Sequence, residues 1–156
     1  MQKIFFSLFI TTLLASACCK PKTSGELYEA ITIERTGCFG KCPVYRAVIM
    51  SNGTATYEGT RDVVRKGKHT ATLTCKAFNS LLKQAADMKF LELADKYPAD
   101  GRAIADLPAL NISFSDGKSV KKVVGKQGAP PTYYEFGKAI DAVLNAATWK
   151  SETEKK

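Results

Sequence analysis

The residues best suited to chemistry are Cys38 and Cys42, whose positions are separated by three residues. Thiols at this spacing can close a disulfide, act as a redox couple, or supply two ligands to a zinc ion. Gly37 and Gly40 permit the tight backbone of a short disulfide-closed loop, and Pro43 fixes the backbone angle where the chain leaves that loop. The choice among these chemistries depends on the compartment that the protein occupies.

The N-terminus predicts export from the cytoplasm. Residues 1–17 contain a basic residue, an apolar run over 4–14 and small residues ahead of Cys18, which is the pattern of an export signal peptide. The apolar run is too short to span a bilayer, which requires about 20 residues. Closely spaced cysteines usually pair in the oxidising compartments that exported proteins enter.

We therefore expect Cys38 and Cys42 to form a structural disulfide, which would stabilise the fold by about 2 kcal/mol. The alternative redox role conflicts with the usual C-x-x-C motif at the start of a helix, because a strand is expected to follow here. A zinc site would have to recruit Cys75 and His69, the single histidine, at a spacing that fits no standard pattern. We expect no catalytic residue, no metal and no cofactor.

The residues around Cys18 indicate how the exported chain is attached. Residues 14–18 (Leu-Ala-Ser-Ala-Cys) resemble the lipobox of bacterial lipoproteins. The resemblance implies cleavage before Cys18 and a diacylglyceryl anchor on its sulfur, which would give stable membrane attachment. An ordinary secreted protein cleaved after Ala17 is the alternative. Because Cys19 and Lys20 follow in place of an acidic residue, the resemblance points to the periplasmic face of the outer membrane.

The cysteine motif also carries a wider resemblance. Residues 37–45 contain the pattern C-F-G-x-C-P-x-Y, and the chain is similar to a family of bacterial, mostly secreted or lipid-anchored proteins with this motif. In that family the motif precedes a strand, a glycine turn and a Y-x-G strand end, which match Asn-Gly at 52–53 and Tyr-Glu-Gly at 57–59. An Asp-Leu-Pro step at 106–108 matches as well. The resemblance covers about residues 29–147 and implies no activity, because the family is a domain of unknown function.

The net charge of +8 makes the protein basic, and removal of residues 1–17 lowers it by one. Outside the cytoplasm a basic protein has no access to nucleic acid, so the plausible anionic partners are lipid head groups, lipopolysaccharide and acidic glycans. A lysine-rich surface that only solubilises the protein is the simpler interpretation. The candidate binding residues lie in two basic segments, which would form one patch only if the fold brings them together: Arg65, Lys66 and Lys68 in the first, and Lys121 and Lys122 in the second.

Alternating apolar residues predict strands that pair as hairpins. The Asn-Gly pair at 52–53 suits a type I′ turn, which would place Val48 opposite Tyr57 and Met50 opposite Ala55. The Asp-Gly pair at 116–117 predicts a second hairpin with a bulge or a longer loop. The expected strands are 31–33, 44–50, 54–59, 69–73, 110–114 and 120–124.

Two segments have helical spacing. Phe78, Leu81, Leu82 and Ala85 form one apolar stripe within residues 74–88. The closing helix is expected to begin with a capping box formed by Thr132 and Glu135. Its buried stripe would contain Phe136, Ile140, Val143, Leu144 and Ala147.

This order of elements predicts an α+β fold, an antiparallel sheet built from hairpins with two α-helices packed on one face. We expect a lipoprotein signal peptide at 1–17, the lipidated cysteine and a short linker at 18–27, one domain at 28–149 and a polar tail at 150–156. The sequence favours a non-enzymatic, lipid-anchored cell-envelope protein with a binding or structural role, whose partner is an envelope protein, a glycan or a lipid. The alternatives are a periplasmic thiol-redox protein that uses Cys38 and Cys42, and a basic module that binds anionic glycan or lipid.

Overall fold

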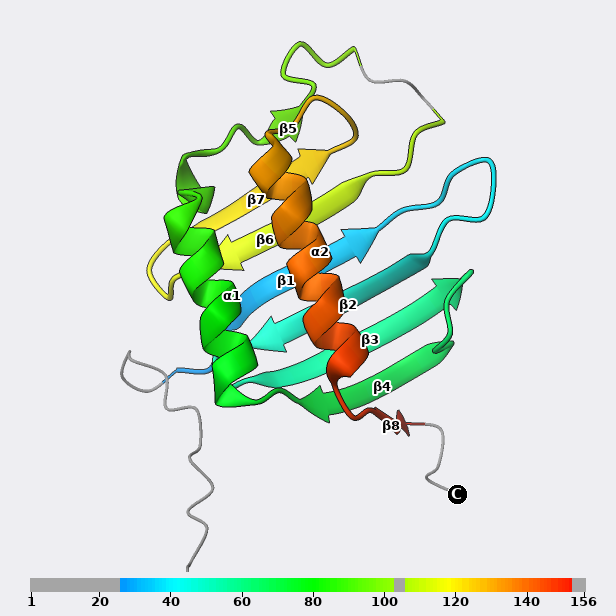
Figure 1. The fold of residues 1–156 in the computed structure, drawn as a ribbon, viewed down its shortest axis with the longest axis vertical. Coiled ribbons are helices and arrows are strands. Elements are labelled where there is room, and N and C mark those ends of the chain that lie inside the picture. Colours follow the sequence, from blue (N-terminus) through cyan, green and yellow to red (C-terminus); the bar gives the residue numbers. More distant parts are fainter. Residues whose placement is uncertain (1–25, 103–105, 153–156) are drawn as a thin grey trace, which may run out of the picture.

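The computed structural model describes residues 26–102 and 106–152. An eight-stranded, mostly antiparallel sheet and two α-helices give the α+β class predicted from the sequence. Both helices lie on the same face of the sheet (Figure 1). The strands are β1 (Glu29–Arg35), β2 (Val44–Met50), β3 (Thr54–Arg61), β4 (Gly67–Thr72), β5 (Lys96–Tyr97), β6 (Leu110–Ser115), β7 (Val120–Gly125) and β8 (Lys150–Ser151); the helices are α1 (Cys75–Asp87), the 3-10 turn η1 (Phe90–Glu92) and α2 (Pro131–Ala146).

The sheet has the strand order β5-β7-β6-β1-β2-β3-β4-β8, so β1 and β2 lie in its middle. Ile31 and Ile33 of β1 are fully buried, whereas Thr32 and Glu34 between them face away from the helices. Alternation of this kind covers one face of an antiparallel sheet and leaves the other face polar. The helices bury their apolar stripes against the covered face, through Phe78, Leu81 and Ala85 of α1 and Tyr133, Phe136, Ile140 and Leu144 of α2.

The first hairpin has a different register from the predicted one. Ala47 lies opposite Tyr57 and Ile49 lies opposite Ala55, a shift of one residue. A type I′ turn needs a positive φ at both central residues, but here only Gly53 has one, at 84°. The Gly53 amide donates to the Met50 carbonyl at 2.9 Å, so the turn begins at Met50 and is longer than predicted.

The second hairpin has the longer loop that the sequence predicts, and its strands pair without a bulge. The Asp116 carboxylate accepts hydrogen bonds from the amides of Lys118 and Ser119 at 2.9 and 2.8 Å. These hydrogen bonds lower the pKa of Asp116. The carboxylate therefore organises the four residues between β6 and β7.

The capping-box prediction for the closing helix is wrong. Helix α2 begins at Pro131, so Thr132 lies inside the first turn and no side chain caps the start. Proline is well suited to the first helical position because its φ is already helical and its missing N–H would have no partner there.

Two very short strands at the edges were also missed. The pair β5–β7 is parallel, and β8 pairs with β4 through His69 and Ser151. Residues 150–151 of the predicted tail therefore belong to the sheet. Both strands contain two residues, which is too short for any periodicity to be visible.

The sheet has two ends with different character. The loop end carries residues 36–43 between β1 and β2, called the disulfide loop, and residues 62–66, called the β3–β4 loop. The turn end, at the opposite side in Figure 1, carries the start of β1, the turn around Gly53 and the start of α1. Among the described residues, no helix is long and apolar enough to cross a membrane. The predicted signal peptide, Cys18 and Cys19 lie outside the described residues.

Candidate functional site: the loop end

The disulfide loop connects the two central strands. Cys38 and Cys42 are joined by a disulfide, with their Cα atoms 5.7 Å apart. The amide of Gly40 donates to Cys38 Sγ at 3.3 Å, which tightens the loop further. Both cysteines are half-buried. Their exposure is therefore intermediate between that of a buried scaffold disulfide and that of an open redox site.

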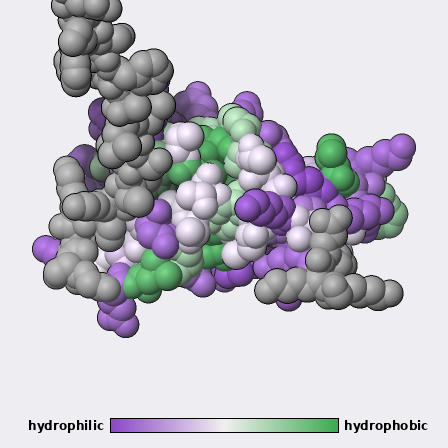
Figure 2. Space-filling view, turned by 90° about the horizontal axis from the view of Figure 1, so that it is seen from below, coloured by the Kyte–Doolittle hydropathy of each residue, from purple (hydrophilic) through white to green (hydrophobic). Residues whose placement is uncertain are grey.

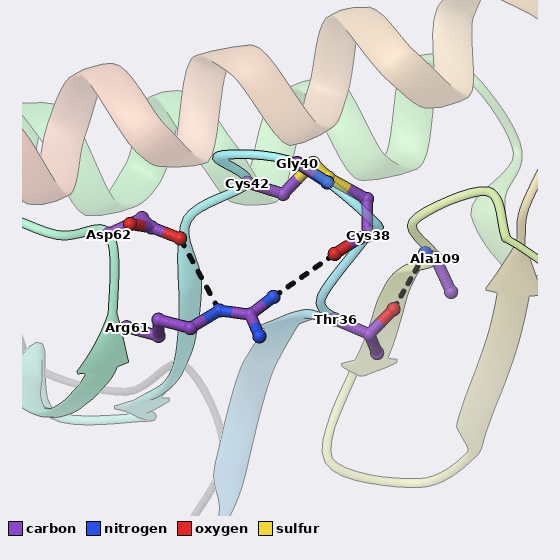
Figure 3. Close-up of a disulfide and its surroundings, with 7 residues drawn as sticks. All are labelled: Thr36, Cys38, Gly40, Cys42, Arg61, Asp62 and Ala109. Atoms are coloured by element: carbon purple, nitrogen blue, oxygen red, sulfur yellow. Dashed lines mark hydrogen bonds and ion pairs between the residues drawn. A yellow bond between two sulfur atoms is a disulfide. The ribbon is translucent and has the colours of Figure 1, made fainter.

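Neighbouring segments hold the loop on both sides (Figure 3). Arg61, the last residue of β3, donates from Nη2 to the Cys38 carbonyl at 3.3 Å and pairs through Nε with Asp62 at 3.3 Å. On the other side, the Thr36 hydroxyl accepts from the Ala109 amide at 2.7 Å, and the Thr36 amide donates to the Ala109 carbonyl at 3.0 Å. The loop is thus fixed by its disulfide and by two neighbouring chain segments.

Gly59 explains the Y-x-G pattern that ends β3. A Cβ atom at Gly59 would lie 1.9 Å from the carbonyl oxygen of Arg65. Such an overlap is impossible, so only glycine lets the β3–β4 loop fold back over the end of its own strand. The close approach places the carbonyl of Arg65 directly against β3.

A polar network links the sheet to α2 beneath these loops. Arg35 of β1 forms an ion pair with Asp141 of α2, and the Tyr45 hydroxyl of β2 donates to the same carboxylate. Burial alone lowers the pKa of Arg35, but the hydrogen bond and charge of Asp141 outweigh burial and raise it. Burial, followed by the hydrogen bond and charge of Asp141, raises the pKa of Tyr45. Arg35 and Tyr45 therefore keep their charged and neutral forms, respectively, at physiological pH.

An aromatic column stands beside this network. The rings of Tyr45 and Tyr57 stack with centroids 5.0 Å apart, and Trp149 lies 5.5 Å from Tyr57. The Arg65 guanidinium lies 5.9 Å from the Tyr57 ring and 5.8 Å from the Trp149 ring, and it donates to the Asn145 carbonyl at 3.4 Å. These are cation–π distances. Within residues 26–102 and 106–152, no carboxylate forms an ion pair with Arg65.

A recess of about 220 Å³ opens between the disulfide loop, the β3–β4 loop and α2. Tyr45, Tyr57, Arg65 and Asn145 are among the residues that line it. A second recess of about 230 Å³ lies on the other side of the disulfide loop and shares Arg35 and Pro43 with the first. The disulfide loop is therefore a ridge between two hollows.

The loop end also exposes two apolar side chains. Phe39, at the tip of the disulfide loop, is 93% exposed, and Val64 of the β3–β4 loop is 100% exposed. Lys41 and Lys66 are exposed beside them, and the side chain of Arg61 is about half exposed. The loop end thus combines apolar tips with a surplus of positive charge.

The structure does not bring the two predicted basic segments together. Arg65 and Lys66 lie at the loop end, whereas Lys68 lies on β4, next to the edge strand β8. Four strands separate β4 from β7, which carries Lys121 and Lys122, so the segments are about 24 Å apart at roughly 4.8 Å per strand. Lys121 is also engaged by Asp95 at 2.5 Å. The five residues do not form one patch.

The predicted zinc alternative gains no support from the geometry. Cys38 and Cys42 are bonded to each other and Cys75 is also disulfide-bonded, so none of these three sulfurs is a thiolate that could bind zinc. His69 packs edge-on against Tyr57 and places Nδ1 3.2 Å from the Gly67 carbonyl. No cluster of His, Cys, Asp and Glu in the described part of the chain could hold a metal ion.

Comparison with known proteins gives one match. A protein-family model described as a domain of unknown function, DUF6438, matches residues 29–144. No curated protein and no solved structure matches the chain. The matched residues include the disulfide loop, the β3–β4 loop and Asp141.

Proposed function

The chain belongs to the DUF6438 family, and we propose that it is a non-enzymatic, lipid-anchored protein of the bacterial cell envelope. We further propose that its loop end binds a protein partner. The predicted signal peptide and the lipobox-like residues before Cys18 support the anchored location. The Cys38–Cys42 disulfide supports an oxidising compartment.

The exposure of Phe39 is the single observation that carries the binding proposal. An aromatic side chain that is 93% exposed gains nothing from packing in the free protein. It sits on a loop that the disulfide, Arg61 and Thr36 hold in place. A rigid, exposed aromatic residue loses little conformational entropy on binding, which is the property of an interface anchor.

The charges around Phe39 indicate the chemistry of the partner. Arg65, Lys41 and Lys66 give the loop end a positive potential that complements an acidic surface. The recess above Tyr57 can accept a side chain of the partner, with Arg65 available to a carboxylate. We therefore expect a protein with an acidic surface that offers an apolar pocket to Phe39 and Val64.

Site-specific crosslinking tests this proposal. Photoreactive residues would be placed at Phe39, at Val64 and, as a matched control, at Val120, which is 74% exposed at the turn end. The full chain would be expressed in export-competent bacterial cells, so that crosslinking takes place in the cell envelope. We expect one crosslinked protein from positions 39 and 64, with loss of that product in Lys66→Glu, and none from position 120. Equal crosslinking at all three positions, or products that contain only lipid or glycan, would contradict the proposal.

A thiol-redox protein remains the second candidate, because the Gly40 amide points at Cys38 Sγ from 3.3 Å. A donor in that position would stabilise a Cys38 thiolate. The reduction potential of the Cys38–Cys42 pair separates the two functions. A potential below about −300 mV indicates a structural disulfide, and one near those of exported oxidoreductases, about −180 to −120 mV, would overturn the non-enzymatic assignment.

A further inference from the structure

The sheet face opposite the helices carries an ordered row of charged side chains. Both helices lie on one face of the sheet, and the other face has no helix over it (Figure 1). The row runs across paired positions of β1, β2, β3 and β4, and its members are Glu34, Arg46, Glu58 and Lys68. The sign of the charge changes from each strand to the next. We propose that this charge row binds a second copy of the chain in a two-fold symmetric, face-to-face dimer.

The neighbours of these residues show that the charge row faces away from the helices. Arg35, next to Glu34, and Tyr45, next to Arg46, both bind Asp141 of α2. Successive side chains of a strand point to opposite faces of the sheet, so Glu34 and Arg46 point away from α2. The register of the neighbouring strands gives the remaining members of the row the same orientation.

The charge row is complementary to a second copy of itself. A two-fold axis parallel to the strands, between β2 and β3, places β1 over β4 of the second copy and β2 over its β3. Glu34 then faces Lys68 of the second copy, and Arg46 faces its Glu58. Symmetry repeats both contacts, so every charge of the row meets an opposite charge. An axis along the row would instead place each charge over the same residue of the second copy, where like charges repel.

The charges are available for these contacts. Glu58 and Lys68 occupy paired positions, yet neither forms an ion pair in the part of the chain that the structure describes. Arg46 reaches Glu29 only at 3.9 Å, and both side chains are more than half exposed. A hollow of about 240 Å³ is lined by Arg46, Glu58 and Lys68 among others, which leaves room for opposing side chains.

The next row has small side chains that let two sheets approach each other. It runs across the same four strands, and its members are Thr32, Val48, Thr56 and Thr70. The proposed axis places Val48 over Thr56 of the second copy, so this row brings no charges together. Val48 is only 6% exposed and lies beside the axis. The contact would therefore have an apolar centre with polar and charged groups around it, as protein interfaces do.

The face is also large enough for a dimer. Face-to-face sheets pack about 10 Å apart with their strands within about 30° of each other, so facing strands stay in register near the axis. Five strands of about six residues cover a flat area of about 480 Å² per copy, at roughly 4.8 Å per strand and 3.3 Å per residue. The relief of the side chains adds to this area, so two copies reach the total of about 1,000 Å² that a specific interface requires.

The symmetry fixes how the two loop ends are placed. A two-fold axis parallel to the strands preserves the strand direction, so both disulfide loops lie at the same end of the dimer. Two copies of Phe39 would then face the same way, which would allow bivalent binding of a partner. The dimer itself does not depend on that binding, because Phe39 is not part of the charge row.

The β4/β8 edge is the competing surface for self-association. Seen from this edge, hydrophobic and neutral residues gather toward the middle, with hydrophilic residues around them (Figure 2). The strand β8 covers only two residues of β4, so a second copy could also pair with the remainder of that edge. Such an edge-to-edge dimer would not use the charge row, and charge reversal therefore distinguishes the two arrangements.

Copurification of two tagged copies tests the proposal. The full chain would be expressed in export-competent bacteria as two copies with different epitope tags, and one tag would be purified from a detergent extract of whole cells. We expect wild-type copies to copurify. Arg46→Glu places a glutamate opposite Glu58 of the second copy, and Glu58→Arg places an arginine opposite its Arg46. Each variant should therefore copurify with itself about ten-fold less.

A mixed pair separates the dimer contact from an effect on the fold. One copy with Arg46→Glu and one copy with Glu58→Arg have opposite charges at both facing positions, so copurification should return to the wild-type level. Arg46 and Glu58 are also neighbours within one sheet, but a second chain cannot repair a defect inside the first. Failure of the mixed pair to copurify would overturn the proposed pairing, as would self-association of Arg46→Glu.

Crosslinking and a loop-end variant complete the test. A photoreactive residue at Thr56, which is exposed beside the axis, should join the two copies, whereas one at Ala146, exposed on α2 beside the β4/β8 edge, should not. Phe39→Ser should leave copurification unchanged. A crosslink from position 146 would favour the edge-to-edge dimer, and loss of copurification in Phe39→Ser would mean that a partner bridges the copies. Wild-type copies that do not copurify would refute the dimer and leave the proposed loop-end binding standing.

Discussion

Arg61 Nη2 donates a hydrogen bond to the carbonyl of Cys38 at 3.3 Å, joining the end of β3 to the disulfide loop. The donor comes from 23 residues farther along the chain, so this contact exists only after the β2–β3 hairpin has formed. Gly37 allows the close approach, because a Cβ there would lie 2.6 Å from the same nitrogen. The loop that presents Phe39 is therefore fixed by the sheet as well as by its own disulfide.

The first prediction concerns the contribution of that disulfide to stability. The double variant Cys38→Ser, Cys42→Ser should lower the free energy of unfolding by about 2 kcal/mol, because without the disulfide the short loop is unconstrained in the unfolded chain. The melting temperature should fall by roughly 6–10 °C, as measured by calorimetry. The variant should still fold, since Arg61 and Thr36 hold the loop. An unchanged melting temperature would show that the disulfide does not stabilise the fold.

A pair of glycine substitutions isolates the close approach at the end of β3. Gly59→Ala should destabilise the domain by about 2 kcal/mol, because the new methyl group would overlap the Arg65 carbonyl and displace the β3–β4 loop. Gly40→Ala is the matched control: no atom lies within 4 Å of its Cβ position, and its φ is not positive. Its stability should change by less than about 0.5 kcal/mol. Urea unfolding measures both, and equal effects would contradict this explanation of the Y-x-G pattern.

Local patterns predicted most of the sheet and both helices, because alternation and helical spacing are visible within a few residues. The errors lie where one backbone angle decides the outcome. Gly53 takes the positive φ and Asn52 does not, which moves the first hairpin by one residue. Pro131 starts α2 before the predicted cap at Thr132.

The site was harder to predict than the fold, because its parts are distant in sequence. Asp141 is separated by 106 residues from Arg35 and by 96 from Tyr45. The only local signal was Asp141 itself, a carboxylate next to the apolar stripe of the closing helix. The motif located the disulfide and Phe39, but the recess depends on how α2 lies across the sheet.

Alkaline pH should destabilise the protein through its buried tyrosines, of which Tyr45 and Tyr133 have the largest upward pKa shifts and Tyr57 a further one. Burial is the largest cause that raises the pKa of both Tyr45 and Tyr133 above the ordinary value of 10.0. Above about pH 10 the unfolded chain releases these protons and the folded protein keeps them, so stability is complete below that pH. It should then fall with a slope of up to about 1.4 kcal/mol per pH unit for each tyrosine.

Urea unfolding between about pH 9 and pH 11.5, followed by tyrosinate absorbance, measures this effect. Tyr45→Phe should reduce the slope without abolishing it, because the pKa values of Tyr133 and Tyr57 remain raised and the Tyr133 hydroxyl still donates to the carbonyls of Leu110 and Val123 at 2.6 and 3.1 Å. An identical slope in Tyr45→Phe would show that Tyr45 titrates normally in the folded state.

A double-mutant cycle measures how strongly Asp141 couples the sheet to α2. Asp141→Asn should cost about 2 kcal/mol, because it leaves the partly buried guanidinium of Arg35 without its counter-charge. Tyr45→Phe should cost about 1 kcal/mol, because it removes one hydrogen bond and leaves the ion pair intact. Asp141→Asn removes the carboxylate that accepts from the Tyr45 hydroxyl, so the two substitutions disrupt the same contact. The double variant should therefore lose less stability than the sum of the single variants.

The expected coupling energy is about 1 kcal/mol, measured from the unfolding free energies of the four proteins at neutral pH. Lys83→Ala is a suitable control for removing an ion pair, because its partner Asp87 is exposed on α1 and the pair adds little stability. Additive effects of Asp141→Asn and Tyr45→Phe would mean that the carboxylate binds Arg35 alone. In that case the Tyr45 hydroxyl would not contribute to holding α2 over the recess.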